Sequence, residues 1–310
     1  MAQVAKFSEL PPYRPARTRL GAAEGTDTSI DGKKGVMKCL LSGETGASGN
    51  FMLVATEGEV ETGYHPRHAH SFDQIRYAHK GDVKFLSDNR PIREGSVAYF
   101  PAGTYYGPYD GDYGGEMISV QFEGSHKAKY YDLGSQEMRD AVEALSRTGT
   151  LKDGVYRWVD ENGRQHAMDS MKALLEYIRK EPEVFPAPRF DEPVVMNPKN
   201  FSWIPTSEGS FTKELGTFTE LKTAIGMIKL PASGSHTLRF DSRITLVIVA
   251  SGSITVDGHE LMPKDALRLD RGERQTAASA GGAELLYFGL PDIAPEPAAS
   301  ARVPELAAAK

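Results

Sequence analysis

The stretch GYHPRHAHSFDQIRYAHKG, residues 63–81, decides the fold of this chain. Within it, His65, His68 and His70 fall close together in a chain of 310 residues that contains only 8 histidines. His68 and His70 are two residues apart, so on a β-strand both side chains point to the same face. This spacing indicates a strand that directs two imidazoles at one point, as a metal site requires. A polar loop with a chance cluster of histidines is the alternative.

A second stretch, GSVAYFPAGTYYGPYD at residues 95–110, follows after a short predicted hairpin. Together the two stretches resemble the paired motifs of the cupin superfamily. The first cupin motif reads Gly, His-x-His, three or four residues, Glu, six residues, Gly; the second reads Gly, five residues, Pro-x-Gly, two residues, His, three residues, Asn. The residues of this chain that fit this spacing are His68, His70, Gln74 by position, Gly81, Gly95, Pro101 and Gly103.

Two ligand positions depart from the cupin pattern, because Gln74 stands where Glu is usual and Tyr106 where the third His is usual. The resemblance implies one divalent metal ion held by His68, His70, Gln74 and Tyr106. Nitrogen and oxygen ligands of this kind suit Fe, Mn, Ni, Cu or Zn, and the sequence does not separate these metals. Gln74 as a hydrogen-bonding core residue and Tyr106 as a barrel-lining aromatic or a proton donor are the alternatives.

Arg76 and His65 complete the set of candidate catalytic residues with Tyr106. Arg76 shares its strand parity with Gln74, so a barrel that encloses Gln74 also encloses the guanidinium. A guanidinium in such a place must be paired. Its partner is either a substrate carboxylate or phenolate, or an internal acid such as Asp73 or Asp110. His65 is expected at the mouth of the barrel, as a base, as a group behind the ligands or as an ordinary loop residue.

The composition argues against several classes of protein. The chain is 40% hydrophobic with a formal net charge of -6, and it has no basic block, which argues against nucleic-acid binding. Its single cysteine, Cys39, excludes an intramolecular disulfide framework. No apolar leader and no apolar run of about 18 residues is present, so we expect no signal peptide, no membrane span and a cytoplasmic protein.

The pattern of short apolar runs and Gly-rich turns predicts a mostly β protein. We expect two cupin-type barrels of the double-stranded β-helix or jelly-roll kind, joined by a mainly helical connector. The expected divisions are an N-terminal arm at 1–35, barrel 1 with the metal site at 36–125, the connector at 126–190, barrel 2 at 191–295 and a tail at 296–310.

The second expected barrel repeats the strand order of the first but lacks its chemistry. His236 is alone, since Leu238 occupies the position of the second histidine of the pair. Barrel 2 is therefore expected to be degenerate and structural.

The resemblance implies a small-molecule enzyme, because two-barrel cupins include quercetin and gentisate-type dioxygenases and oxalate decarboxylases. Our first hypothesis is a metal-dependent dioxygenase acting on a phenolic or enolic acid. A non-redox, metal-dependent lyase, isomerase or hydrolase is the second, and a small-molecule-binding cupin without catalysis is the third. We also expect a homo-oligomer, namely a dimer, since cupin barrels commonly pair.

Overall fold

The computed structural model describes residues 2–12, 35–43, 49–58, 67–87, 90–109, 114–123, 136–152, 154–218 and 222–291. Over these residues the protein is mostly β, with two α-helices, as predicted. None of the helices in these ranges combines the length and the apolar character needed to cross a bilayer. The predictions that concern His65, Asp110 and the tail lie outside the described residues.

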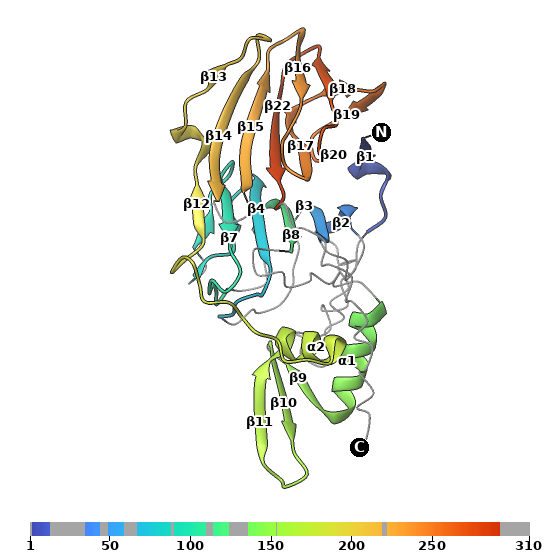
Figure 1. Cartoon of the computed structure of the whole chain (residues 1–310), viewed down its shortest axis with the longest axis vertical. Helices are drawn as coiled ribbons and strands as arrows, with labels where there is room; N and C mark the ends of the chain where they lie inside the picture. The colour runs from blue at the N-terminus through green and yellow to red at the C-terminus, as the bar shows by residue number, and fades with distance from the viewer. Residues whose placement is uncertain are drawn as a thin grey trace, which may run out of the picture.

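The N-terminal half is built on a six-stranded sheet with the strand order β12-β7-β4-β8-β3-β2 (Figure 1). Neighbouring strands are antiparallel throughout. The strands are β2 (Gly35–Ser42), β3 (Phe51–Gly58), β4 (Asp73–Lys80), β7 (Val97–Phe100), β8 (Glu116–Phe122) and β12 (Val194–Met196). A two-stranded sheet accompanies it, formed by β5 (Val83–Lys84) and β6 (Pro91–Ile92).

The C-terminal half combines a seven-stranded and a four-stranded sheet. In order across the larger sheet, the strands are β1 (Gln3–Ala5), β20 (Ala266–Asp270), β17 (Ile244–Gly252), β22 (Ala283–Gly289), β15 (Thr223–Leu230), β14 (Phe211–Phe218) and β13 (Ile204–Pro205). The smaller sheet is formed by β16 (Gly234–Leu238), β21 (Gln275–Ser279), β18 (Ile254–Val256) and β19 (His259–Leu261).

Three apolar clusters hold these sheets together, and their membership follows from the two-residue period of the strands. One face of each large sheet contributes to a shared core that includes Ile75, Tyr99, Leu246 and Phe288. The opposite face of the six-stranded sheet carries a second cluster, in which Phe100 belongs with Tyr106. The third cluster joins the seven-stranded to the four-stranded sheet.

Each large sheet receives an edge strand from the other half of the chain. β1 pairs with β20, and it comes from the expected N-terminal arm. β12 pairs with β7, although its residues fall in the part of the sequence assigned to the second barrel. Both short strands therefore cross the division of the chain that the sequence suggested, and they tie the two halves together.

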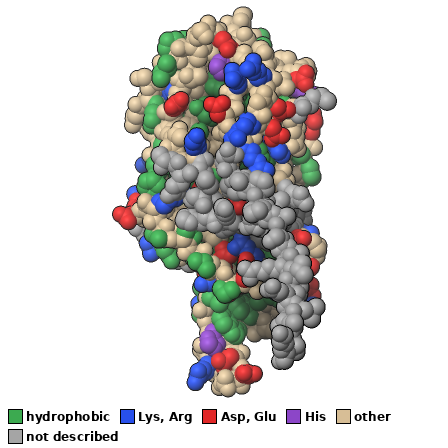
Figure 2. Space-filling view, in the orientation of Figure 1, with side chains coloured by type: hydrophobic (Ala, Val, Ile, Leu, Met, Phe, Trp, Pro, Cys, Tyr) green, Lys and Arg blue, Asp and Glu red, His purple; other side chains and the backbone are tan. Residues whose placement is uncertain are grey.

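The segment between the halves contains two helices, α1 (Gln136–Thr148) and α2 (Ser170–Arg179), as predicted. It also contains a three-stranded antiparallel sheet of β9 (Gly149–Lys152), β10 (Val155–Val159) and β11 (Gln165–Asp169), which the prediction of a mainly helical connector did not include. The connector is thus mixed rather than mainly helical. It projects from one end of the molecule (Figure 1). On the face shown in Figure 2, basic and acidic side chains are interspersed over the upper half.

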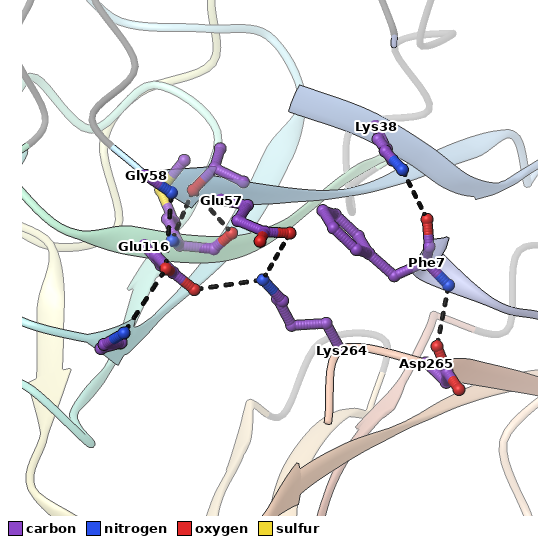
Figure 3. Close-up of polar contacts among 10 residues, drawn as sticks. Phe7, Lys38, Glu57, Gly58, Glu116, Lys264 and Asp265 are labelled. Carbon is purple, nitrogen blue, oxygen red and sulfur yellow. Dashed lines mark hydrogen bonds and ion pairs between the residues drawn. The ribbon is translucent and has the colours of Figure 1, made fainter. Parts of the chain in front are cut away.

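A polar contact between the halves is centred on Lys264, in the turn between β19 and β20 (Figure 3). Its ammonium group lies 3.2 Å from Glu57 and 3.2 Å from Glu116, and its side chain is only 12% exposed. The same ammonium group lies 4.4 Å from the ring centroid of Phe7, whose backbone N–H donates to Asp265 at 2.8 Å. The two ion pairs of Lys264 and its cation–π contact therefore connect the six-stranded sheet and the N-terminal segment to the same turn.

Replacing Lys264 by Met is expected to destabilise the protein by about 1–3 kcal/mol, because it removes the nearer cation from Glu116, whose side chain is only 14% exposed. The measurement is urea unfolding. The control is Lys80→Met, whose ammonium group lies 4.0 Å from the same Glu116 but is 76% exposed, so that it should contribute little. Equal losses of unfolding free energy in the two variants would contradict the role given to Lys264.

Candidate functional site

The two cupin-like stretches pair with one another just before β4. His68 and Tyr106 form a β-bridge in which each backbone N–H donates to the other's carbonyl at 3.0 Å. The N–H of Gly103 donates to the carbonyl of His70 at 2.7 Å. The backbone thus brings the two histidines and the tyrosine together, and all three side chains are buried.

Strand β4 adds Gln74 and Arg76 to this group from the same face, as their parity predicted. Both side chains are almost completely buried. Gln121, on the neighbouring strand β8, lies opposite Gln74 in the register of the sheet. We call the side chains of His68, His70, Gln74, Arg76, Tyr106 and Gln121 the His–Tyr–Arg cluster.

Hydrogen bonds link the cluster in a definite direction. The phenol oxygen of Tyr106 accepts from the amide nitrogen of Gln74 at 3.2 Å and from the Nη2 of Arg76 at 3.3 Å. Two donors occupy its lone pairs, so its own hydrogen is directed to His70, whose Nε2 lies 2.9 Å away. Neutral His70 then carries its ring proton on Nδ1.

The carbonyl oxygen of Gln74 is held by two further donors. The Nη2 of Arg76 donates to it at 2.8 Å, and the amide nitrogen of Gln121 donates at 3.0 Å. Gln74 therefore turns its amide nitrogen, not its oxygen, toward Tyr106. A negatively charged glutamate at this position would accept from Arg76 as well, but it could donate nothing to the phenol.

Arg76 has no acidic partner among the described residues. Its Nε and Nη1 are buried and have no hydrogen-bond partner there. Its guanidinium instead lies 3.3 Å from the ring centroid of Phe85, a cation–π contact. Of the two acids proposed as internal partners, Asp73 lies on the opposite face of β4 and pairs with Arg189, and Asp110 lies outside the described residues.

Asp73 belongs to a second buried cluster behind the first. Its carboxylate accepts from the phenol of Tyr99 at 2.6 Å, from the N–H of Ala102 at 2.7 Å and from Arg189 at 3.2 Å. Burial raises the pKa of Asp73 above its usual range, although these donors and the charge of Arg189 oppose the rise. By accepting from Ala102, Asp73 holds the turn at residues 101–103 in place, and this turn leads along the chain to Tyr106.

The segment that leads out of the connector packs on the same turn. Gly103 adopts a positive φ of 81°, and a Cβ placed on it would lie 2.2 Å from the carbonyl oxygen of Pro186. The hydroxyl of Thr104 donates to the carbonyl of Phe190 at 3.2 Å. Residues 186–190 therefore hold the turn from outside while Asp73 holds it from within.

The motifs did not point to Gln121, a member of the cluster, or to Phe85, which contacts it. The alternation of β8 could have found Gln121, since a polar residue there interrupts a run of apolar ones. Phe85 follows the two-residue strand β5 and carries no sequence signal. Tyr105, next to Tyr106, points outward and is 42% exposed.

The four predicted ligands do not fit a divalent metal ion in this arrangement. The oxygens of Gln74 and Tyr106 have their lone pairs engaged by N–H donors, and a guanidinium lies within 3.3 Å of both. Within the described ranges, no group of three or more His, Cys, Asp or Glu side chains is placed to hold a metal. Among the described residues, a cation at this point would therefore meet the charge of Arg76 and no compensating carboxylate. Metal binding by His68 and His70 alone stays a prediction.

Over the described residues, the polar contacts of His236 in the C-terminal half are with Ser210 and Glu208 and not with a second histidine. The Nδ1 of His236 lies 2.7 Å from the buried hydroxyl of Ser210 and 3.9 Å from a carboxylate oxygen of Glu208. Burial lowers the pKa of this imidazole, which favours its neutral form. The structural role expected for this half stays a prediction.

Comparison with known proteins relates the fold, but not the sequence, to other proteins. No protein-family model matches the chain, and no curated protein matches it. The chain is similar in structure to a "putative dioxygenase" from Nostoc punctiforme, with a TM-score of 0.53 and 11% identity over 95% of this chain and 85% of that one. It is also similar to oxalate decarboxylase from Bacillus subtilis, with a TM-score of 0.52 and 14% identity over 94% of this chain and 77% of that one.

The chain shares its overall fold with these two proteins. At such low identity they establish the fold alone, because one fold supports many reactions.

Proposed function

We propose that this chain is a two-barrel cupin enzyme that transfers a proton to or from a small organic acid, in the class of lyases, isomerases or hydrolases. The observation that carries this proposal is the placement of the Tyr106 phenol between the base His70 and the cation Arg76. The N-terminal six-stranded sheet would belong to the active barrel, and the two sheets of the C-terminal half to the structural one.

In the proposed reaction, the bound substrate displaces the hydrogen bond from Arg76 to the phenol oxygen, which at 3.3 Å is the longer of the two that this oxygen accepts. Tyr106 then takes a proton from the substrate on the freed lone pair while its own proton passes to the Nε2 of His70. The hydroxyl of Tyr106 already donates to the Nε2 of His70, so the path for this proton is present before the substrate binds. The guanidinium of Arg76 lies beside the phenol and stabilises the negative charge that develops on the substrate. Gln74 holds the phenol and the guanidinium at a fixed separation, since it donates to one and accepts from the other.

The metal-dependent dioxygenase was the first hypothesis from the motifs, and it stays a prediction. It requires a redox metal, and the donor set described above does not favour one. Oxygen consumption during turnover, measured with an electrode, separates it from the proton-transfer reaction. The dimer, the cytoplasmic location and the lack of nucleic-acid partners also stay predictions.

Removing the hydroxyl group of Tyr106 is expected to lower proton transfer by about 10²–10⁴-fold, the usual contribution of a positioned acid or base. The variant is Tyr106→Phe, and the measurement is the rate at which the protein exchanges the acidic C–H of enolisable acids for deuterium in D₂O. This assay needs no knowledge of the product.

Tyr105→Phe is the matched control, because this neighbouring tyrosine is exposed and should not alter the exchange rate. A Tyr106→Phe protein that exchanges as fast as the wild type would contradict the proposal. Binding of organic acids without any exchange or turnover would instead support a cupin that binds and does not catalyse.

A further inference from the structure

An irregularity in strand β4 places a histidine beside the contact between the two halves. Where β4 pairs with β8, Ala78 lies opposite Met117 and Lys80 opposite Glu116, so His79 is the extra residue of a β-bulge. A bulge redirects the side chain that it carries. Other residues carry out the proposed proton transfer, so His79 has no part in it.

The imidazole of His79 is half-buried, and one of its nitrogens is left without a hydrogen bond. Its Nδ1 is closed to solvent and has no partner among the described residues. A neutral imidazole can leave a bare lone pair on this nitrogen, whereas an imidazolium would carry an N–H there without an acceptor. Because an unpaired buried donor is costly, the geometry favours the neutral ring.

Four charged groups act on this ring from the elements around it. They are Glu116 on β8, Lys264 in the turn before β20, Lys80 on β4 itself and Glu94 in the turn between β6 and β7. Burial lowers the pKa of His79, and the two lysines add to this effect while the two glutamates oppose it. The ring of Tyr77 lies 6.0 Å away between centroids, and burial raises the pKa of this phenol to about 12, so that it stays neutral.

A proton on His79 would act on the contact between the halves through Lys264. We call the contacts of Lys264 with Glu57, Glu116 and Phe7 the Lys264 junction (Figure 3). An imidazolium nearby would compete for the carboxylate of Glu116 and repel the ammonium group. Lys264 also has a left-handed backbone with a φ of 77°, which a residue other than glycine keeps only while its surroundings hold it.

We infer that His79 is a proton sensor built into the contact between the halves, and that acidification loosens the Lys264 junction and frees strand β1 from the edge of β20. β1 depends on this junction because it leads directly to Phe7, whose ring lies 4.4 Å from the ammonium group of Lys264. The inference is independent of the proposed proton transfer at Tyr106, since the junction lies outside the His–Tyr–Arg cluster.

The sign of the effect follows from where His79 can take up a proton. In the closed junction its pKa is lowered, whereas in the opened junction the ring reaches water and keeps its ordinary pKa of about 6.5. The opened state therefore binds the proton more readily, and opening becomes easier as the pH falls below about 6.5. Well above that value the ring is neutral in both states and has no effect on opening.

The test is hydrogen–deuterium exchange of the full-length protein at about pH 7.5 and about pH 5.5, corrected for the pH dependence of the chemical exchange rate. One linked proton changes an equilibrium by at most about tenfold per pH unit. For peptides within residues 2–10, we expect the opening equilibrium of the wild type to rise by up to about tenfold at the lower pH. Peptides of the connector should not show this rise.

Three variants assign the rise to its cause. His79→Phe keeps a flat ring in the bulge but takes up no proton, so it should abolish the rise. His166→Phe is the matched control, because this imidazole lies on β11 of the connector, and it should leave the rise unchanged. Lys264→Met keeps His79 but removes the repelled cation, so it should reduce the rise even if His79→Phe fails to fold.

The inference would be overturned by a wild type whose residues 2–10 open equally at both pH values. It would also be overturned by a rise that persists in His79→Phe or is undiminished in Lys264→Met. A rise of the same size in the connector peptides would show that acid loosens the whole protein rather than the junction, and would contradict the inference as well.

Discussion

Replacing Arg189 by Met is expected to lower the free energy of unfolding by about 3–5 kcal/mol at neutral pH, the usual cost of breaking a buried ion pair. Asp73 and Arg189 have side chains that are 2% and 16% exposed, so water cannot replace the lost cation. The phenol of Tyr99 and the N–H of Ala102 would remain, but neither carries a charge.

The pH dependence of this loss follows from the direction of the pKa shift. Burial raises the pKa of Asp73, and Arg189 opposes the rise, so the variant should have a still higher pKa at this carboxyl. A group whose pKa is raised in the folded state favours folding below its unfolded pKa, and this contribution is lost as the pH rises through the folded pKa. The loss of stability in the variant should therefore be small below about pH 4, where the carboxyl is protonated in both proteins, and should grow as the pH rises through the raised folded pKa.

Urea unfolding of both proteins across this range provides the measurement. The double variant Asp73→Asn with Arg189→Met is the control, because it removes both charges and should recover much of the loss. A deficit independent of pH would show that Arg189 acts through packing rather than through its charge.

Gly103→Ala is the second large effect, and it should disturb both stability and the site. The positive φ alone costs an alanine about 1–2 kcal/mol. The new Cβ would also lie 2.2 Å from the carbonyl oxygen of Pro186, a backbone atom that cannot rotate away. We expect the loss to exceed the conformational cost alone, together with loss of Tyr106-dependent proton exchange.

Gly95→Ala isolates the effect of the contact. Gly95 has nearly the same φ, 79°, but a Cβ there meets nothing within 4 Å. It should therefore show the conformational cost alone in urea unfolding. Equal losses at the two glycines would mean that residues 186–190 do not hold the turn as described.

The sequence could predict every member of the His–Tyr–Arg cluster except Gln121, because the others follow from local rules. The two-residue period of β4 places Gln74 and Arg76 on one face, and the spacing of the two motifs brings His68 near Tyr106. The direction of the hydrogen bonds was not predictable, because it depends on Gln121 and Arg76 meeting the same amide oxygen. Because of these two hydrogen bonds, we interpret Gln74 as the residue that positions the phenol and the guanidinium and not as a metal ligand.

Long-range pairing set the other limit to prediction. Asp73 precedes Gln74 in sequence, and its parity alone directs it away from Arg76, but nothing local indicates Arg189 as its partner, 116 residues away. The edge strands β1 and β12 have three residues each, which is too short to show a period. These strands pair with the edges of the two large sheets, and those edges exist only once the halves have folded.

The crossing of β1 and β12 between the halves has a consequence for the synthesis of this protein. Residues 3–5 leave the ribosome long before their partners, residues 266–268, which follow some 260 positions later. At about 5–20 residues per second, the first strand waits roughly 13–50 s for its neighbour. Until β12 has emerged, the nascent N-terminal sheet exposes the open edge of β7, a surface on which a second nascent chain could add a strand. Chaperones that shield strand edges should therefore matter more for this chain than for one whose halves are each complete in sequence.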